Sequence, residues 1–159
     1  MPAVYAFLKV DDCPGDSQDH GHKDEIHLES WSWGETQSGQ VGAPGSQSRV
    51  QMQDFHFTMR VNKASPKLLL ACATAQKIPK AVLSCCMHLK GTREFLKYTL
   101  SDVFVSSYQT GMTGHSGLPI DQVSLSYGKI EVEYKGLGAD GTLGAAAKVG
   151  YDLKANKRA

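Results

Sequence analysis

The chain has 159 residues, which fits one domain (residues 1–159) with a sizeable hydrophobic core, and no apolar run is long enough to span a membrane. Its 17 Lys and Arg residues nearly balance its 16 Asp and Glu residues, which leaves a net charge of +1. This balance argues against nucleic acid as a partner, because binding to phosphates requires concentrated positive charge, and the missing span argues against membrane insertion.

The N-terminal stretch "MPAVYAFLKVDDC" has no basic start, and Lys9 interrupts its apolar run. A cleaved signal peptide is therefore not expected. We expect assembly in the cytoplasm, and we expect any export to use a route that does not depend on a cleaved signal peptide. Residues 4–10 are predicted to form the first strand, which ends at the turn-rich "DDCPGDSQD".

The second predicted strand, "EIHLESWSWG", contains a change in the phase of its apolar residues. Ile26 and Leu28 lie two positions apart, but Trp31 and Trp33 follow with the opposite parity. A bulge near residues 29–30 would let all four side chains reach the interior, since an extra residue reverses the facing of those that follow. We expect both tryptophans to be core anchors.

Two small hydroxyl side chains, Ser30 and Ser32, alternate with the tryptophans in this strand of residues 25–34. Side chains of a strand alternate between its two faces, so the serines would lie on an outer wall. The loop of residues 34–48 that follows is rich in Gly and Ser and has no periodicity. Loops of this length inside a compact domain are usually functional or disordered.

A third strand is predicted over residues 49–61. In it Phe55, Phe57, Met59 and Val61 alternate with polar residues. Such alternation is typical of a half-buried strand. We expect Phe55 and Phe57 to be core anchors together with the two tryptophans.

The segment "NKASPKLLLACATAQK" changes to a helical period. Ser65 is predicted to be the N-cap and Pro66 the first helical residue, without the Glu or Gln that would complete a capping box. Leu68, Leu69 and Cys72 would form the apolar stripe of this short helix. We expect it to be the one helix of the fold.

Strands and Gly-rich turns fill the remaining sequence. Residues 80–89 and 94–107 are predicted to pair around the hairpin turn "KGTR", and the loop "YQTGMTGHSGLP" follows. The long strand of residues 120–135 changes phase near Gly128, where a bulge is expected. "GLGADGTLG" is predicted to be a turn and "KVGYDL" a short last strand, before a flexible tail of residues 154–159.

This pattern of many strands and one helix predicts a mainly β protein. The two strands that change phase favour an antiparallel β-barrel of two packed sheets with one short flanking α-helix, because bulges supply the bending that closure requires.

Motifs for catalysis and metal binding are weak. "GHSGL" resembles a nucleophile elbow, but the elbow requires Gly where this chain has Leu118, and a helix where a strand is predicted. His20 and His22, with His27 or Cys13, are an alternative metal set, although they lie in a polar segment without a Cys pair. We interpret His20 and His22 as solvated loop residues, with the alternative that His22, just before the second strand, ties down the turn through a backbone hydrogen bond. We expect no catalytic residues, no metal and no cofactor.

Four cysteines occur, at positions 13, 72, 85 and 86. Cys85 and Cys86 are adjacent in a predicted strand, so they would point to opposite faces, and one metal or one disulfide cannot easily use both. We expect Cys13, Cys85 and Cys86 to be incidental buried thiols.

Three segments, "GDSQDHGHKDEIHLESWSWG", "DFHFTMRVNKASPKLLLACATAQ" and "VSLSYGKIEVEY", resemble the haemolysin-coregulated protein (Hcp) family, the tube proteins of bacterial type VI secretion systems. The resemblance runs nearly end to end, and "KVGYDL" fits the closing segment of the family. It implies a β-barrel with one flanking helix and no enzymatic activity. The cysteines Cys13, Cys85 and Cys86 depart from the family pattern.

The resemblance also implies an assembly. Six copies would form a ring with a wide channel, and rings would stack into a tube inside a contractile sheath, beneath a VgrG spike. Contraction would export the tube with small effector proteins in its channel. The face that carries Ser30 and Ser32 would line the channel. The loop of residues 34–48 would reach toward a neighbouring ring or subunit through Gly39, Gln40, Val41, Gly42, Ala43, Pro44 and Gly45.

A protein of a different class remains an alternative, namely a monomeric β-barrel that binds a small ligand in its interior. That alternative predicts an internal cavity. A tube subunit instead predicts a barrel core filled around the four aromatic anchors, with cargo held between subunits. A metal-dependent enzyme that uses His20 and His22 would predict bound zinc.

Overall fold

The computed structural model describes residues 3–37, 50–88, 91–115, 117–138 and 142–159. These residues form twelve strands and one helix, and the helix is neither long nor apolar enough to cross a membrane. The N-terminal half contains β1 (Val4–Val10), β2 (Ile26–Leu28), β3 (Ser30–Ser32), β4 (Glu35–Gln37), β5 (Val50–Met52), β6 (Phe55–Arg60) and α1 (Ser65–Thr74). The C-terminal half contains β7 (Ile78–His88), β8 (Thr92–Gly111), β9 (Ile120–Ser126), β10 (Lys129–Leu137), β11 (Leu143–Asp152) and β12 (Lys157–Arg158).

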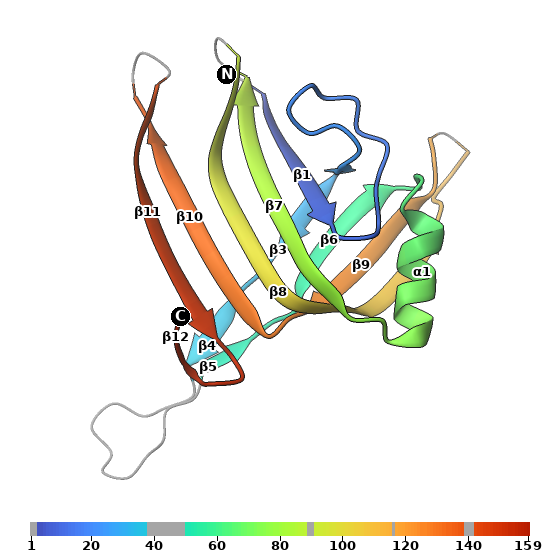
Figure 1. Cartoon of the computed structure of the whole chain (residues 1–159). Coiled ribbons are helices and arrows are strands. Elements are labelled where there is room, and N and C mark those ends of the chain that lie inside the picture. The colour runs from blue at the N-terminus through green and yellow to red at the C-terminus, as the bar shows by residue number, and fades with distance from the viewer. Residues whose placement is uncertain (1–2, 38–49, 89–90, 116, 139–141) are drawn as a thin grey trace.

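The strands form two curved antiparallel sheets that share the long strand β8. The first sheet has the strand order β12-β11-β10-β8-β7-β1-β2, and the second sheet has the order β3-β6-β9-β8. A separate ribbon consists of β4 and β5. Figure 1 shows β7, β8, β10 and β11 running side by side, with β3, β6 and β9 behind them and α1 at one end. This arrangement confirms the predicted mainly β architecture of two packed antiparallel sheets with one flanking helix.

The core lies between the two sheets and is covered at one end by α1. Phe55 and Phe57 of β6 are 0% and 2% exposed and pack among aliphatic side chains from both sheets. Their burial follows from the alternation of the strand, whose polar residues face the other way. The other large apolar side chains that are at most 1% exposed are Leu8, Ile26, Met59, Leu68, Ile78, Leu83, Leu100, Val103 and Leu125.

The tryptophans Trp31 and Trp33 pack against this core but are only partly buried. Trp31 lies on β3, which is at the end of the second sheet and pairs with β6, and Trp33 follows directly after this strand. Both indole rings therefore lie at the rim of the core. Trp31 stacks on Phe55 at 5.9 Å and meets Tyr98 edge-on at 5.3 Å between ring centroids. The Trp33 indole donates a hydrogen bond to the Tyr127 hydroxyl, and burial raises the pKa of Tyr127 to about 12. The tryptophans therefore stabilise the rim of the core and not its centre.

The two places where the predicted strands change phase are corners at which the chain passes between the sheets. β2 pairs with β1 in the first sheet, and after Glu29 the chain continues as β3 beside β6 in the second sheet. β9 lies in the second sheet, and after Gly128 the chain continues as β10 in the first sheet. The single strands predicted over residues 25–34 and 120–135 are each two strands, because the bend at the phase change gives the two halves different hydrogen-bonding partners.

Two boundaries near the ribbon differ from the prediction. The predicted strand of residues 49–61 is interrupted at residues 53–54, between β5 and β6, and Val61 is 40% exposed. The loop predicted over residues 34–48 begins later, because β4 pairs with β5 in antiparallel register. The sequence of β4 is polar throughout, so it contains no alternation of apolar and polar residues from which a strand could be predicted.

The C-terminal strands are longer than predicted, because their antiparallel pairing continues past the apolar residues on which the prediction was based. β8 continues to Gly111, so the Gly-rich loop begins after that residue and not at Tyr108. β11 begins at Leu143 and not at Lys148. Residues 154–159 do not extend as a free tail, because β12 folds back and pairs with β11. The predicted turn "KGTR" lies partly outside the described residues.

The helix α1 begins at Ser65, with Ala64 at the N-cap position and no side-chain cap, so the predicted N-cap is one residue off. The Ser65 hydroxyl instead donates a hydrogen bond of 2.6 Å to Asp121, a fully buried carboxylate on β9. This bond ties the start of the helix to the second sheet. Leu68 faces the core, but Leu69 is 52% exposed, so the apolar stripe is narrower than predicted.

We expect Phe57→Ala to lower the free energy of unfolding by about 3–5 kcal/mol, because the change removes a buried ring from a packed core. Phe104→Ala is the matched control, since Phe104 is 42% exposed. This variant should lower the free energy of unfolding clearly less than Phe57→Ala does. Denaturant unfolding followed by tryptophan fluorescence measures both changes. Equal losses for the two variants would contradict the placement of Phe57 at the centre of the core.

Candidate functional site

The outer face of the second sheet carries two rows of polar side chains that run across its four strands. The pairing register brings together one residue from each strand in each row. The first row consists of Ser30, Thr58, Gln122 and Gln109, and the second row consists of Ser32, His56, Ser124 and Ser107. We call these eight residues the polar face.

The row between these two rows faces the core. Trp31 pairs with Phe57, and Phe57 pairs with Val123 on the next strand. Phe57 and Val123 are each 2% exposed. Because successive side chains of a strand point to opposite faces, the burial of this row turns both neighbouring rows outward. Ser30 and Ser32 are accordingly exposed, on the side of β3 opposite Trp31.

Hydrogen bonds join neighbouring strands across the polar face. The Ser30 and Thr58 hydroxyls lie 2.6 Å apart, and His56 Nδ1 lies 2.6 Å from the Ser124 hydroxyl. Cross-strand pairs of this kind contribute roughly 0.2–1 kcal/mol each. They fix the orientation of the side chains, so the polar face presents ordered donors and acceptors.

The contact between His56 and Ser124 is also the contact of a base with a nucleophile. A hydrolytic site needs in addition a group that orients the base. Within the described part of the chain, no carboxylate contacts the other ring nitrogen of His56. Ser124 is only 9% exposed, which leaves its hydroxyl little access to a substrate. Among the described residues, this pair therefore lacks the orienting group and the access to substrate that a hydrolytic site needs.

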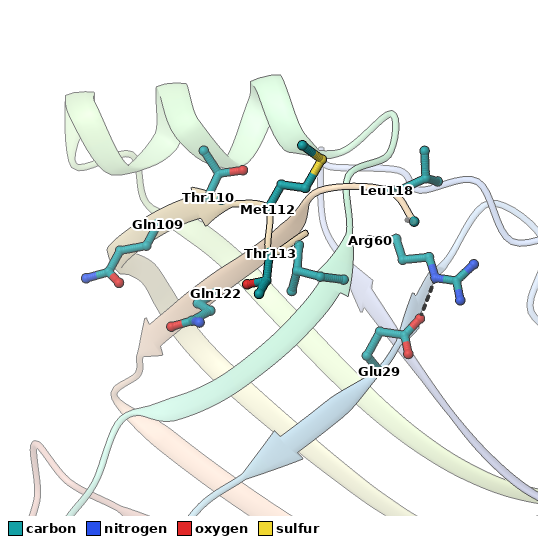
Figure 2. A pocket seen from close by; sticks show the side chains of 11 residues that line it. Glu29, Arg60, Gln109, Thr110, Met112, Thr113, Leu118 and Gln122 are labelled. Carbon is teal, nitrogen blue, oxygen red and sulfur yellow. Dashed lines mark ion pairs between the residues drawn. The ribbon is translucent and has the colours of Figure 1, made fainter. Parts of the chain in front are cut away.

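Charged residues flank the polar face at both ends. Arg60 Nε lies 2.9 Å from Glu29 Oε1, and the Ser106 hydroxyl donates a hydrogen bond of 2.6 Å to Asp54. Figure 2 shows the Arg60–Glu29 pair at one side of a surface hollow and Gln122 at the other. The two ion-pair side chains are 66% and 44% exposed, so the pair contributes at most about 1 kcal/mol to stability. The rows between these ends contain no Lys, Arg, Asp or Glu.

The predicted assembly loop is the part of the candidate site that lies outside the described residues. Its ends are visible as the ribbon of β4 and β5, in which Gln37 pairs with Val50. The two ends of the loop therefore leave the ribbon side by side. The predicted loop residues themselves are Gly39, Gln40, Val41, Gly42, Ala43, Pro44 and Gly45, and their structure is not described.

The four cysteines are free thiols, and each is buried or partly buried. Cys85 lies in the core, whereas Cys86 contacts His22 across 3.2 Å, from Sγ to Nε2. The expectation that these two neighbours face opposite sides of the strand is confirmed. Burial, and after it the carboxylate of Glu94, raise the pKa of the Cys86 thiol to about 12, so this thiol stays protonated at neutral pH.

His22 is buried, and the expectation of a solvated loop histidine is wrong for it. Its Nδ1 lies 3.0 Å from the Glu25 carboxylate, and its ring stacks on Phe7 at 4.6 Å between centroids. His20 is exposed, and Cys13 lies in the hydrophobic core. The alternative metal set of the sequence is therefore not brought together.

Known proteins match the chain over nearly its whole length. A family model described as "Type VI secretion system effector, Hcp" matches residues 7–134. The Hcp1 protein of Pseudomonas aeruginosa is 35% identical over 163 residues, which cover 99% of each chain. A solved structure of "a type six secretion system protein" superimposes with a TM-score of 0.90 at 28% identity, over 99% of this chain and 100% of that one. The crystal structure of Hcp1 from Salmonella typhimurium gives a TM-score of 0.81 at 31% identity, over 99% of each chain.

Proposed function

The chain belongs to the Hcp family of type VI secretion system proteins, and we propose that it is a structural subunit that closes into a hexameric ring and stacks into the inner tube of the machine. Hcp proteins are secreted components of tube assemblies and not a known enzyme family. The six-fold ring, the cargo and the contacts with other components are our inference for this chain. The observation that supports them most is the polar face.

The polar face is suited to line a channel through which different cargo proteins pass. Its hydroxyl, amide and imidazole groups offer both donors and acceptors to a polypeptide surface. A wall with one sign of charge would attract cargo of the other sign and repel the rest. Ser30 and Ser32 are small and exposed, and we propose that they contact small effector proteins inside the channel.

The far edge of the first sheet supports a contact between subunits. Val149 on β11 is 62% exposed, and Tyr134 on β10 is 51% exposed. Among the described strands, β11 is covered on its outer side only by β12, at Tyr151 and Asp152. Unpaired edge groups and exposed apolar side chains favour burial against another chain. A head-to-tail contact there closes a ring when its rotation is six-fold, with an interface on the order of 1,600 Å² in total.

We assign the remaining contacts by analogy with the family. The ribbon of β4 and β5 carries the segment between Gln37 and Val50, whose Gly and Pro residues suit a segment that takes one shape on docking. In this proposal the loop contacts the next ring or subunit, the VgrG spike covers the tip of the tube, and the contractile sheath surrounds it. Contraction then exports the tube from the cell.

The packed interior argues against the alternative of a monomeric barrel that binds a small ligand. Phe55 and Phe57 occupy the space between the sheets, and Trp31 packs at its rim. Space for a ligand inside the barrel would require these rings to move out. Binding is therefore assigned to the outer surfaces and to the channel between copies.

We expect the purified chain to sediment as a ring with six times the mass of the 17.2 kDa subunit. The expectation follows from the exposed sheet edge, which one copy alone leaves uncovered. Analytical ultracentrifugation across micromolar concentrations measures the mass, and negative-stain images show the shape. A monomer at every concentration would refute the proposed assembly.

We expect Ser32→Gln to leave folding and ring formation intact but to reduce the amount of protein cargo that co-purifies with the ring. The longer side chain would crowd the channel wall at a position where the wild type has a hydroxyl. Thr74→Gln on α1 is the matched control, because Thr74 is also an exposed hydroxyl residue but lies away from the polar face. Equal cargo recovery from both variants and the wild type would show that Ser32 does not face cargo.

A further inference from the structure

The segment of residues 11–25, between β1 and β2, folds over the outer face of the first sheet. Backbone hydrogen bonds shape it, from the Ser17 N–H to the Glu25 carbonyl and from the Asp24 N–H to the Ser17 carbonyl. His22 lies under this segment, 8% exposed, with its ring parallel to that of Phe7 on β1. The segment therefore carries an imidazole into a buried position against the sheet.

Three metal-ligating side chains meet there. The ligand atoms of His22, Cys86 and Glu94 all lie within 4.8 Å of one another, and His22 and Cys86 are buried. Cys86 and Glu94 are directly opposite each other on β7 and β8, where the register shifts after Cys85. The irregularity in the pairing places the thiol and the carboxylate side by side beneath the imidazole.

The spacing of the donors fits a zinc-type ion. Zinc binds His nitrogen at about 2.0–2.1 Å and Cys sulfur at about 2.3 Å in tetrahedral sites, which places the two donors about 3.5 Å apart. His22 Nε2 lies 3.2 Å from Cys86 Sγ, so an ion between them requires a movement of only a few tenths of an ångström. Glu94 is partly exposed, which gives the site an opening to solvent.

The surroundings of the site also favour a cation. Glu25 contacts Nδ1 of His22 through both carboxylate oxygens at 3.0 Å, which makes Nδ1 the protonated nitrogen and directs the Nε2 lone pair at Cys86. A carboxylate behind a ligating histidine is the usual second contact in zinc sites. Asp19 adds a further negative charge near the thiol, together with Glu25 and Glu94.

We propose that His22, Cys86 and Glu94 bind one zinc-class divalent ion, which fastens the segment of residues 11–25 to β7 and β8. Binding replaces the thiol proton of Cys86 by a sulfur–metal bond and releases that proton to solvent, with no change in oxidation state. A water molecule completes the coordination. The ion would act as a structural clamp on the outside of the first sheet, separate from the polar face.

The proposal is tested by titrating the purified full-length chain with Co²⁺, which reports thiolate ligation by a sulfur-to-cobalt charge-transfer band. We expect one equivalent to bind, and the band to disappear on addition of zinc. Cys86→Ser should abolish the band. Cys85→Ser is the matched control, because Cys85 faces the core on the other side of the strand, and it should keep the band. Glu25→Gln should weaken cobalt affinity about 10- to 100-fold.

Circular dichroism accompanies each titration, so that loss of binding is distinguished from loss of folding. If Cys86→Ser does not fold, Glu94→Gln decides the question, because Glu94 is partly exposed and its amide removes a ligand without a large change of shape. A folded wild type without the charge-transfer band at saturating Co²⁺ would overturn the proposal. So would a band that survives in folded Cys86→Ser, or undiminished affinity in folded Glu94→Gln.

Discussion

The structure depends on the pairing register of β3, β6, β9 and β8. With this register Phe57 meets Trp31 on one side and Val123 on the other, and the three side chains form one inward row. A slip by one residue would turn every side chain of a strand to the opposite face. The burial of the aromatic row, at roughly 25 cal/mol per Å² of apolar surface, therefore selects the register that also displays the polar face. Core and binding surface are two consequences of one alignment.

The corners of the barrel follow from the same alternation. The chain passes from the first sheet to the second after Glu29 and from the second sheet to the first after Gly128, and at both places the apolar residues change parity. At the first of these corners Glu29 and Ser30 are both exposed, and this break in the alternation reverses which side chains of the following strand face the core. The sequence therefore predicts where the corners lie. The sequence does not predict that each of these segments forms two strands with different partners. Periodicity shows which face of a strand is apolar, but it does not show which strand pairs with it.

The candidate site divides in a similar way into predictable and unpredictable parts. Ser30 and Ser32 are recognisable from the strand that contains them, because they alternate with the tryptophans. Their neighbours Gln122 and Ser107 come from distant segments and join the polar face only through the register of three strand pairs. The contact of His22 with Cys86 spans 64 residues and depends on the fold of a loop, which has no periodicity to read. Such contacts follow from tertiary structure and leave no local signal.

The central claim is that the polar face of each subunit forms the wall of a channel enclosed by copies of the chain. An electron cryo-microscopy map of the purified assembly tests this claim most directly, because side-chain density would show the surroundings of β3, β6 and β9. We expect Ser32, His56 and Ser107 to point into the central opening of a ring. A ring in which this face is buried between subunits, or turned to the outside, would contradict it.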